Sequence, residues 1–96
     1  MNKKEAYSIL LQELSTLRMK PYPELCTLVG SPIVLERMAP GGTHYQLEID
    51  ILWDDPRKTR GDIRVIASID DGGLLSAFSP LTEAFIMAPA GHFVGE

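Results

Sequence analysis

The sequence has a single cysteine, Cys26, so it can form neither an intramolecular disulfide nor a cysteine-rich zinc site. The neighbours of Cys26 are apolar, which favours a small buried residue over a nucleophile. Basic residues are also few: the chain has nine Lys and Arg against thirteen Asp and Glu, which gives a net charge of −4. Since nucleic-acid binding depends on Lys and Arg that neutralise phosphates, this balance argues against a nucleic-acid partner.

Long apolar runs are absent as well. No stretch approaches the roughly 18 residues that a membrane-spanning helix needs. The apolar run at residues 9–11 is stopped by Gln12 and Glu13, which is too short for the core of a signal peptide. We therefore expect a cytoplasmic protein with no membrane partner, and the single cysteine suits that reducing compartment.

The strongest pattern in the chain is a long β-hairpin. Residues 45–53 and 63–70 carry an apolar side chain at every odd position, and β-branched and aromatic types are frequent among them. Alternation with a period of two predicts strands with one buried face. The segment between the two arms, residues 54–62, is the most charged part of the chain.

Two helices are expected before this hairpin. Residues 3–18 carry an apolar stripe at helical spacing, with Asn2 as a candidate N-cap and Glu5 in the first turn. Residues 23–29 predict a second, short helix, because Pro23 opens the segment and Gly30 follows its end.

Two further strands complete the predicted sheet. A strand at 32–38, joined by a five-residue turn, would pair Ile33 with Ile49 and Leu35 with Leu47. The Asp71-Gly72 turn predicts another hairpin, whose second arm at 74–78 would place Phe78 opposite Val65. The expected fold is α+β, a single domain over 1–96. Its two N-terminal helices would pack on one face of a four-stranded antiparallel meander (32–38, 44–53, 62–70, 74–78), and an irregular C-terminal segment would follow.

The outer, even-numbered face of this sheet should be polar, but one corner is not. Leu52, Ile66 and Leu75 gather there in the expected register. Either the apolar segment at 81–87 folds over this corner, or a second subunit covers it, since monomers rarely expose large apolar patches. The interface candidates are therefore Leu52, Ile66, Leu75, Phe85 and Met87.

The charged end of the hairpin supplies the other candidates. The residues that could meet a ligand or partner are Trp53, Asp54, Asp55, Arg57, Arg60 and Arg64. The adjacent pair Asp54-Asp55 lacks the alternate spacing of a calcium loop, so no metal or other cofactor is expected. The flanking acidic residues predict that the basic cluster is largely neutralised from within, and Arg64 could pair across the strands with Asp50 or Glu48.

Taken whole, the chain resembles a family of small bacterial proteins of similar length with no assigned activity. The residues that carry the likeness are the leading helix, the strand and loop at 45–57, the Asp-Asp-Gly-Gly turn at 70–73 and the ending at 85–96. The resemblance implies a stand-alone domain and nothing about chemistry.

Three functional hypotheses follow. No catalytic residue stands in a recognisable constellation, so the first is a non-enzymatic protein-interaction or regulatory module that could form a homodimer. The alternative is a small-ligand-binding protein or an enzyme whose site lies at the Trp53 to Arg60 end of the sheet. A weaker alternative is an accessory nucleic-acid binder that uses the basic residues at 57–64.

Overall fold

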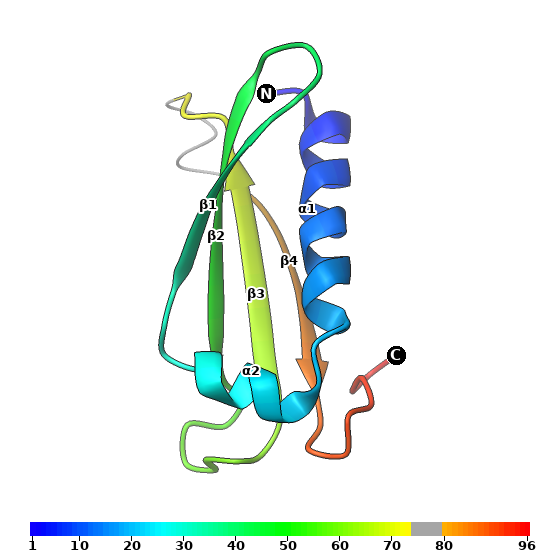
Figure 1. Cartoon of the computed structure of the whole chain (residues 1–96), viewed down its shortest axis with the longest axis vertical. Coiled ribbons are helices and arrows are strands. Elements are labelled where there is room, and N and C mark those ends of the chain that lie inside the picture. The colour runs from blue at the N-terminus through cyan, green and yellow to red at the C-terminus, as the bar shows by residue number, and fades with distance from the viewer. Residues whose placement is uncertain (74–79) are drawn as a thin grey trace.

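A computed structural model describes residues 1–73 and 80–96. These residues form two helices and a four-stranded antiparallel sheet with the spatial order β1-β2-β3-β4. The elements are α1 (Lys3–Arg18), α2 (Tyr22–Leu28), β1 (Ile33–Met38), β2 (His44–Trp53), β3 (Ile63–Asp70) and β4 (Leu81–Met87). Helix α1 runs along one face of the sheet, and α2 crosses its lower end (Figure 1). The predicted α+β class, with both helices N-terminal, is confirmed.

Helix α1 begins where the sequence predicts. The Asn2 side chain accepts a hydrogen bond of 3.0 Å from the Glu5 backbone N–H, which satisfies one of the free donors of the first turn. The residues that α1 buries are Ala6, Leu10, Leu14 and Leu17, a stripe at helical spacing that faces β3 and β4. Helix α2 lies one residue earlier than expected, because Val29 is already extended (ψ 128°).

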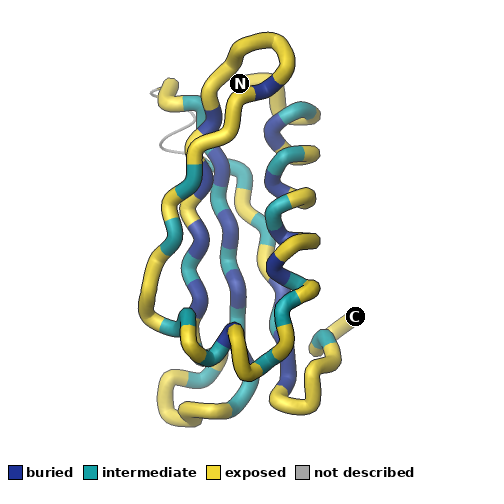
Figure 2. The backbone as a smooth tube through the Cα atoms, in the orientation of Figure 1, coloured by how far each residue is buried: buried dark blue, intermediate teal, exposed yellow. Residues whose placement is uncertain are grey.

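Strands β1 and β2 have the predicted register. Ile33 pairs with Ile49 and Leu35 with Leu47 across β1 and β2. Every odd position of β2 from 45 to 51 and of β3 from 63 to 69 is buried, while their even positions are exposed or half-buried (Figure 2). The core is therefore one layer of side chains between this sheet face and the helices.

The fourth strand differs from the prediction. Strand β4 pairs with β3 so that Ile69 lies opposite Leu81, Val65 opposite Phe85 and Ile63 opposite Met87. The expected pairing of Val65 with Phe78 is therefore wrong, and the predicted strand at 74–78 lies outside the described residues. The segment at 81–87, which lacked a clear period in the sequence, alternates once it is paired, since Phe85 and Met87 are buried and Thr82 and Ala84 are exposed.

The C-terminal segment folds back along β4 and not across the outer face of the sheet. The Val94 N–H donates to the Ile86 carbonyl at 2.8 Å, and Phe93 forms a β-bridge with Met87. The guanidinium of Arg18, at the end of α1, lies 4.9 Å from the Phe85 ring centroid and 4.6 Å from that of Phe93. It also donates to both Glu96 carboxylate oxygens, at 2.7 and 2.8 Å. One arginine thus joins the first helix to the last residues.

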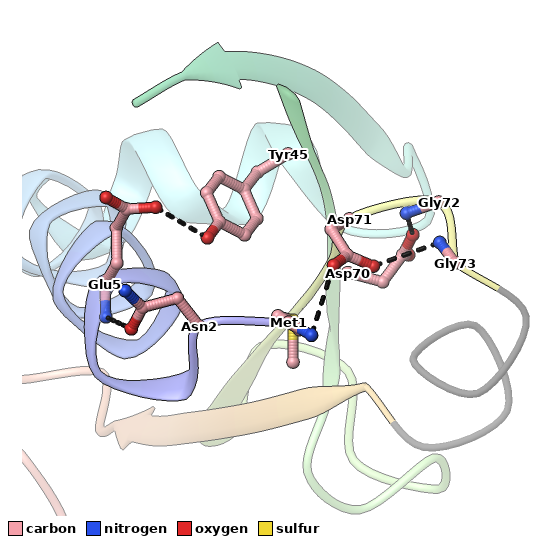
Figure 3. A network of polar contacts seen from close by, with 8 residues as sticks. All are labelled: Met1, Asn2, Glu5, Tyr45, Asp70, Asp71, Gly72 and Gly73. Atoms are coloured by element: carbon pink, nitrogen blue, oxygen red, sulfur yellow. Dashed lines mark hydrogen bonds and ion pairs between the residues drawn. The ribbon is translucent and has the colours of Figure 1, made fainter. Parts of the chain in front are cut away.

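A polar network closes the opposite end of the molecule (Figure 3). The Tyr45 side chain is 1% exposed, and its hydroxyl donates to the Glu5 carboxylate at 2.8 Å. Nearby, the amino group of Met1 lies 3.5 Å from the Asp71 carboxylate. Burial, and then the contact with Glu5, raises the pKa of the Tyr45 phenol to about 12.

Tyr45→Phe should destabilise the protein by about 1 kcal/mol, because the Glu5 carboxylate loses its phenol donor. Since the pKa of Tyr45 is higher in the folded protein than the ordinary 10.0, the unfolded chain ionises first, and wild-type stability should fall as the pH rises from 10 towards 12. Urea unfolding at pH 8, 10 and 11 measures this. The phenylalanine variant corrects for other alkaline titrations, and an advantage of the wild type that stays constant over this range would contradict the prediction.

Arg18→Lys should also destabilise the protein, by about 1 kcal/mol, although the charge is kept. A lysine ammonium cannot present a planar cation to the two rings and bind both Glu96 oxygens at the same time. Arg37→Lys is the matched control, because Arg37 forms an ion pair with Glu13 and no aromatic contact of Arg37 is present among the described residues. Equal losses of unfolding free energy in the two variants would mean that the aromatic contacts of Arg18 contribute nothing.

Candidate functional site

Both helices pack on one face of the sheet, and no described helix or strand covers the opposite, outer face. Two neighbouring rows of this face carry apolar side chains from three strands. One row holds Leu52 of β2 and Ile86 of β4 on either side of Arg64, and the next holds Ile66 of β3 beside Ala84 of β4. Leu52 is 37% exposed, and Ile66 and Ile86 are half-buried. We call Leu52, Ile66, Ala84 and Ile86 the apolar corner.

The structure places two of the five expected interface residues on the outer face. Leu52 and Ile66 lie together on the outer face, as predicted, and Leu75 lies outside the described residues. Phe85 and Met87 are 3% and 2% exposed and lie in the core, so they are not available to a partner. They were misplaced because β4 was not recognised as a strand. Its even positions, Ala84 and Ile86, are the residues that reach the corner.

Four acidic side chains lie elsewhere on the outer face, among polar residues and the exposed Val34 and Met38 of β1. Glu48 and Asp50 precede Leu52 on β2, with Glu36 on β1 and Asp70 on β3 in the adjoining rows. None of these four carboxylates forms an ion pair with another described residue. The one basic side chain in these rows, Arg64, is bound to Asp54 at 2.7 Å and not to Asp50 or Glu48 as expected. The face therefore presents an apolar corner beside uncompensated negative charge.

The charged loop at 54–62 is mostly neutralised from within. Asp54 binds Arg64, and Asp55 binds both the backbone N–H and the guanidinium of Arg57. These contacts hold the pKa of the Asp55 carboxyl below its ordinary value. The predicted basic cluster is thus reduced to Lys58 and Arg60, for which no ion pair is present in the described part of the chain.

The predicted ligand set is divided between two places. Trp53 and Arg60 line a hollow of about 430 Å³ between α2 and the loop, together with Tyr22, Pro23, Cys26 and Thr27. Asp54 and Asp55 line a different hollow, beside Lys58 and Pro89. Arg57 is largely exposed and lines neither. The concave site that the ligand hypothesis requires therefore exists for Trp53 and Arg60 alone.

Helix α2 contributes four residues to this hollow, and the sequence singled out none of them for a site: Tyr22, Pro23, Cys26 and Thr27. The Tyr22 hydroxyl donates to the Gly61 carbonyl at 2.7 Å and ties α2 to the loop. Burial is the main cause that raises the pKa of Tyr22, and the charge of Arg60 acts in the opposite direction. Cys26, expected to be buried, is half-buried and lies beside Tyr22. The sequence feature that could have marked Tyr22 is its place between Pro21 and Pro23 at the start of a helix.

Comparison with family models, with curated proteins and with solved structures found no match. The resemblance to small bacterial proteins stays a prediction. Among residues 1–73 and 80–96, no helix is long and apolar enough to span a membrane, and no three His, Cys, Asp or Glu side chains gather as a metal-binding group. A functional assignment therefore depends on the geometry of the outer face and of the hollow.

Tyr22→Phe should cost about 1 kcal/mol of unfolding free energy, because the partly buried Gly61 carbonyl loses its donor. Tyr7→Phe is the matched control, since the Tyr7 hydroxyl donates to Glu83 at 3.1 Å on the surface and the residue is 41% exposed. Urea unfolding of both variants compares the two bonds. A loss in Tyr22→Phe no larger than in Tyr7→Phe would mean that α2 is held to the loop by packing alone.

Proposed function

We propose that this protein is a non-enzymatic interaction module that binds a partner protein on the outer face of its sheet. The observation that carries the proposal is the apolar corner, which neither helix nor the C-terminal segment at 88–96 covers. Burying such side chains contributes roughly 25 cal/mol per Å², so an open corner favours association. We infer a cytoplasmic location, in keeping with the single cysteine.

The acidic residues around the corner select the chemistry of the partner. Asp50 lies directly opposite Ile66, Glu48 lies one row further along β2, and the whole chain carries a charge of −4. A second copy of this chain would bring like charges together, which opposes self-association through this face. A partner surface with apolar side chains and surrounding Lys or Arg complements both features, and its approach would be accelerated by electrostatic attraction. The partner we propose is therefore a basic protein.

The test compares Leu52→Lys with Leu11→Lys. Both leucines are exposed, 37% and 43%, but Leu11 lies on α1, away from the corner. The wild type and both variants are immobilised, the protein they capture from the source organism is identified, and its affinity is then measured with purified components. We expect Leu52→Lys to weaken this binding at least about tenfold, and Leu11→Lys to leave it within about twofold. Raising the salt concentration should weaken wild-type binding.

Light scattering at several concentrations decides between a foreign partner and a second copy. A monomer at all concentrations, together with a purified basic partner whose binding Leu52→Lys weakens, supports the proposal. A dimer that Leu52→Lys dissociates would assign the corner to a second copy and overturn the proposed basic partner. Equal binding of the purified partner to both lysine variants, or no specific partner and no dimer, would overturn the outer face as a docking surface.

A further inference from the structure

The hollow between α2 and the charged loop has the features of a binding site that is separate from the outer face. Its volume, about 430 Å³, falls within the usual range for small-molecule sites. The hydrogen bond from Tyr22 to the Gly61 carbonyl joins its two sides, so helix and loop are held at a fixed separation. Trp53, an odd-numbered residue of β2, lines the hollow from the helix side of the sheet, whereas Leu52 faces outward.

Arg60 is the cation of this hollow, and its electrostatic situation differs from that of the other arginines. Arg18, Arg37, Arg57 and Arg64 each form an ion pair with a carboxylate. No ion pair of Arg60 is present among the described residues, although acidic residues outnumber basic ones in the chain. A guanidinium that lines a hollow and forms no ion pair with a described residue is suited to bind a carboxylate through two parallel hydrogen bonds.

The backbone of Arg60 is also unusual. Its φ is +66°, and in the part of the chain that the structure describes it is the one non-glycine residue with a positive φ. This conformation disfavours side chains that carry a Cβ, and glycine adopts it readily. The next residue, Gly61, has no positive φ, but a Cβ there would lie 3.0 Å from the Lys58 carbonyl oxygen, so the turn is tight. An arginine in a conformation that favours glycine motivates the hypothesis that its side chain has a use.

The rest of the lining is mostly apolar and includes two aromatic residues. The Trp53 indole, the Tyr22 ring and Pro23 line the hollow beside the guanidinium. Aromatic rings stack favourably on such surfaces, while a charged group at one end of the ligand would meet Arg60. We propose that this hollow binds a small aromatic carboxylate, whose ring contacts Trp53 and Tyr22 and whose carboxylate binds the Arg60 guanidinium.

The experiment uses benzoate as the probe and the full chain as the protein. Trp53 is the only tryptophan, so its indole N–H gives one assigned signal in a nitrogen-correlated NMR spectrum. Benzoate should shift that signal saturably. Benzamide, which keeps the ring without the charge, and acetate, which keeps the charge without the ring, should each bind at least about tenfold more weakly. Benzamide binding as tightly as benzoate would overturn the role of the cation, and acetate binding as tightly would overturn the role of the ring.

Two variants of Arg60 separate binding from folding. Arg60→Gln should weaken benzoate binding at least about tenfold, whereas Arg57→Gln, the same change in the same loop, should leave it within about twofold. Arg60→Gly should abolish binding, yet unfold at the same or a higher urea concentration, because glycine relieves the positive φ. Unchanged affinity in the well-folded Arg60→Gly, or no saturable shift of the Trp53 signal with benzoate up to solubility, would overturn the proposal.

Discussion

The rest of the structure depends on one constraint, which is that the two helices are enough to cover only one face of the sheet. Strands β2 and β3 place apolar residues at every odd position, and this face has to be covered for the chain to fold. Two helices, one of 16 residues and one of seven, suffice for that face alone. Among residues 1–73 and 80–96 no second layer covers the opposite face, so packing in the core does not dictate its side chains. It carries the apolar corner, and four acidic residues lie elsewhere on it: Glu36, Glu48, Asp50 and Asp70.

The first three strands and both helices could be predicted because their signals are local. Alternation with a period of two, the Asn2 cap and the turn chemistry at 39–43 each act within a few residues. Strand β4 could not be found in this way. Its sequence reads Leu-Thr-Glu-Ala-Phe-Ile-Met, and Ile86 between Phe85 and Met87 hides the alternation. Pairing with β3 supplies the missing information, since it fixes which of the three apolar residues turn inward.

The candidate sites also divide into residues that the sequence reveals and residues that it does not. The sequence singles out Leu52, Ile66, Trp53 and Arg60. Strand position decides the face of the first three, and its charge marks Arg60. The contributions of Tyr22 and Cys26 were missed, since they reach the hollow through the placement of α2 beneath the sheet. That placement depends on long-range contacts, such as Tyr22 with Gly61 and the Gly30 N–H with the Ile51 carbonyl. Likewise, the ion pair of Arg64 with Asp54 follows from side-chain geometry at the strand end.

Adjacent residues of one strand serve the two proposed surfaces. Leu52 and Trp53 end β2 and, because successive side chains of a strand point to opposite faces, one reaches the outer corner and the other the hollow. A substitution of Leu52 therefore alters one surface and a substitution of Trp53 the other, although both residues belong to the same strand. Binding of the ligand would change the affinity for the partner only if the end of β2 had two arrangements. With a single rigid arrangement, the two binding free energies add.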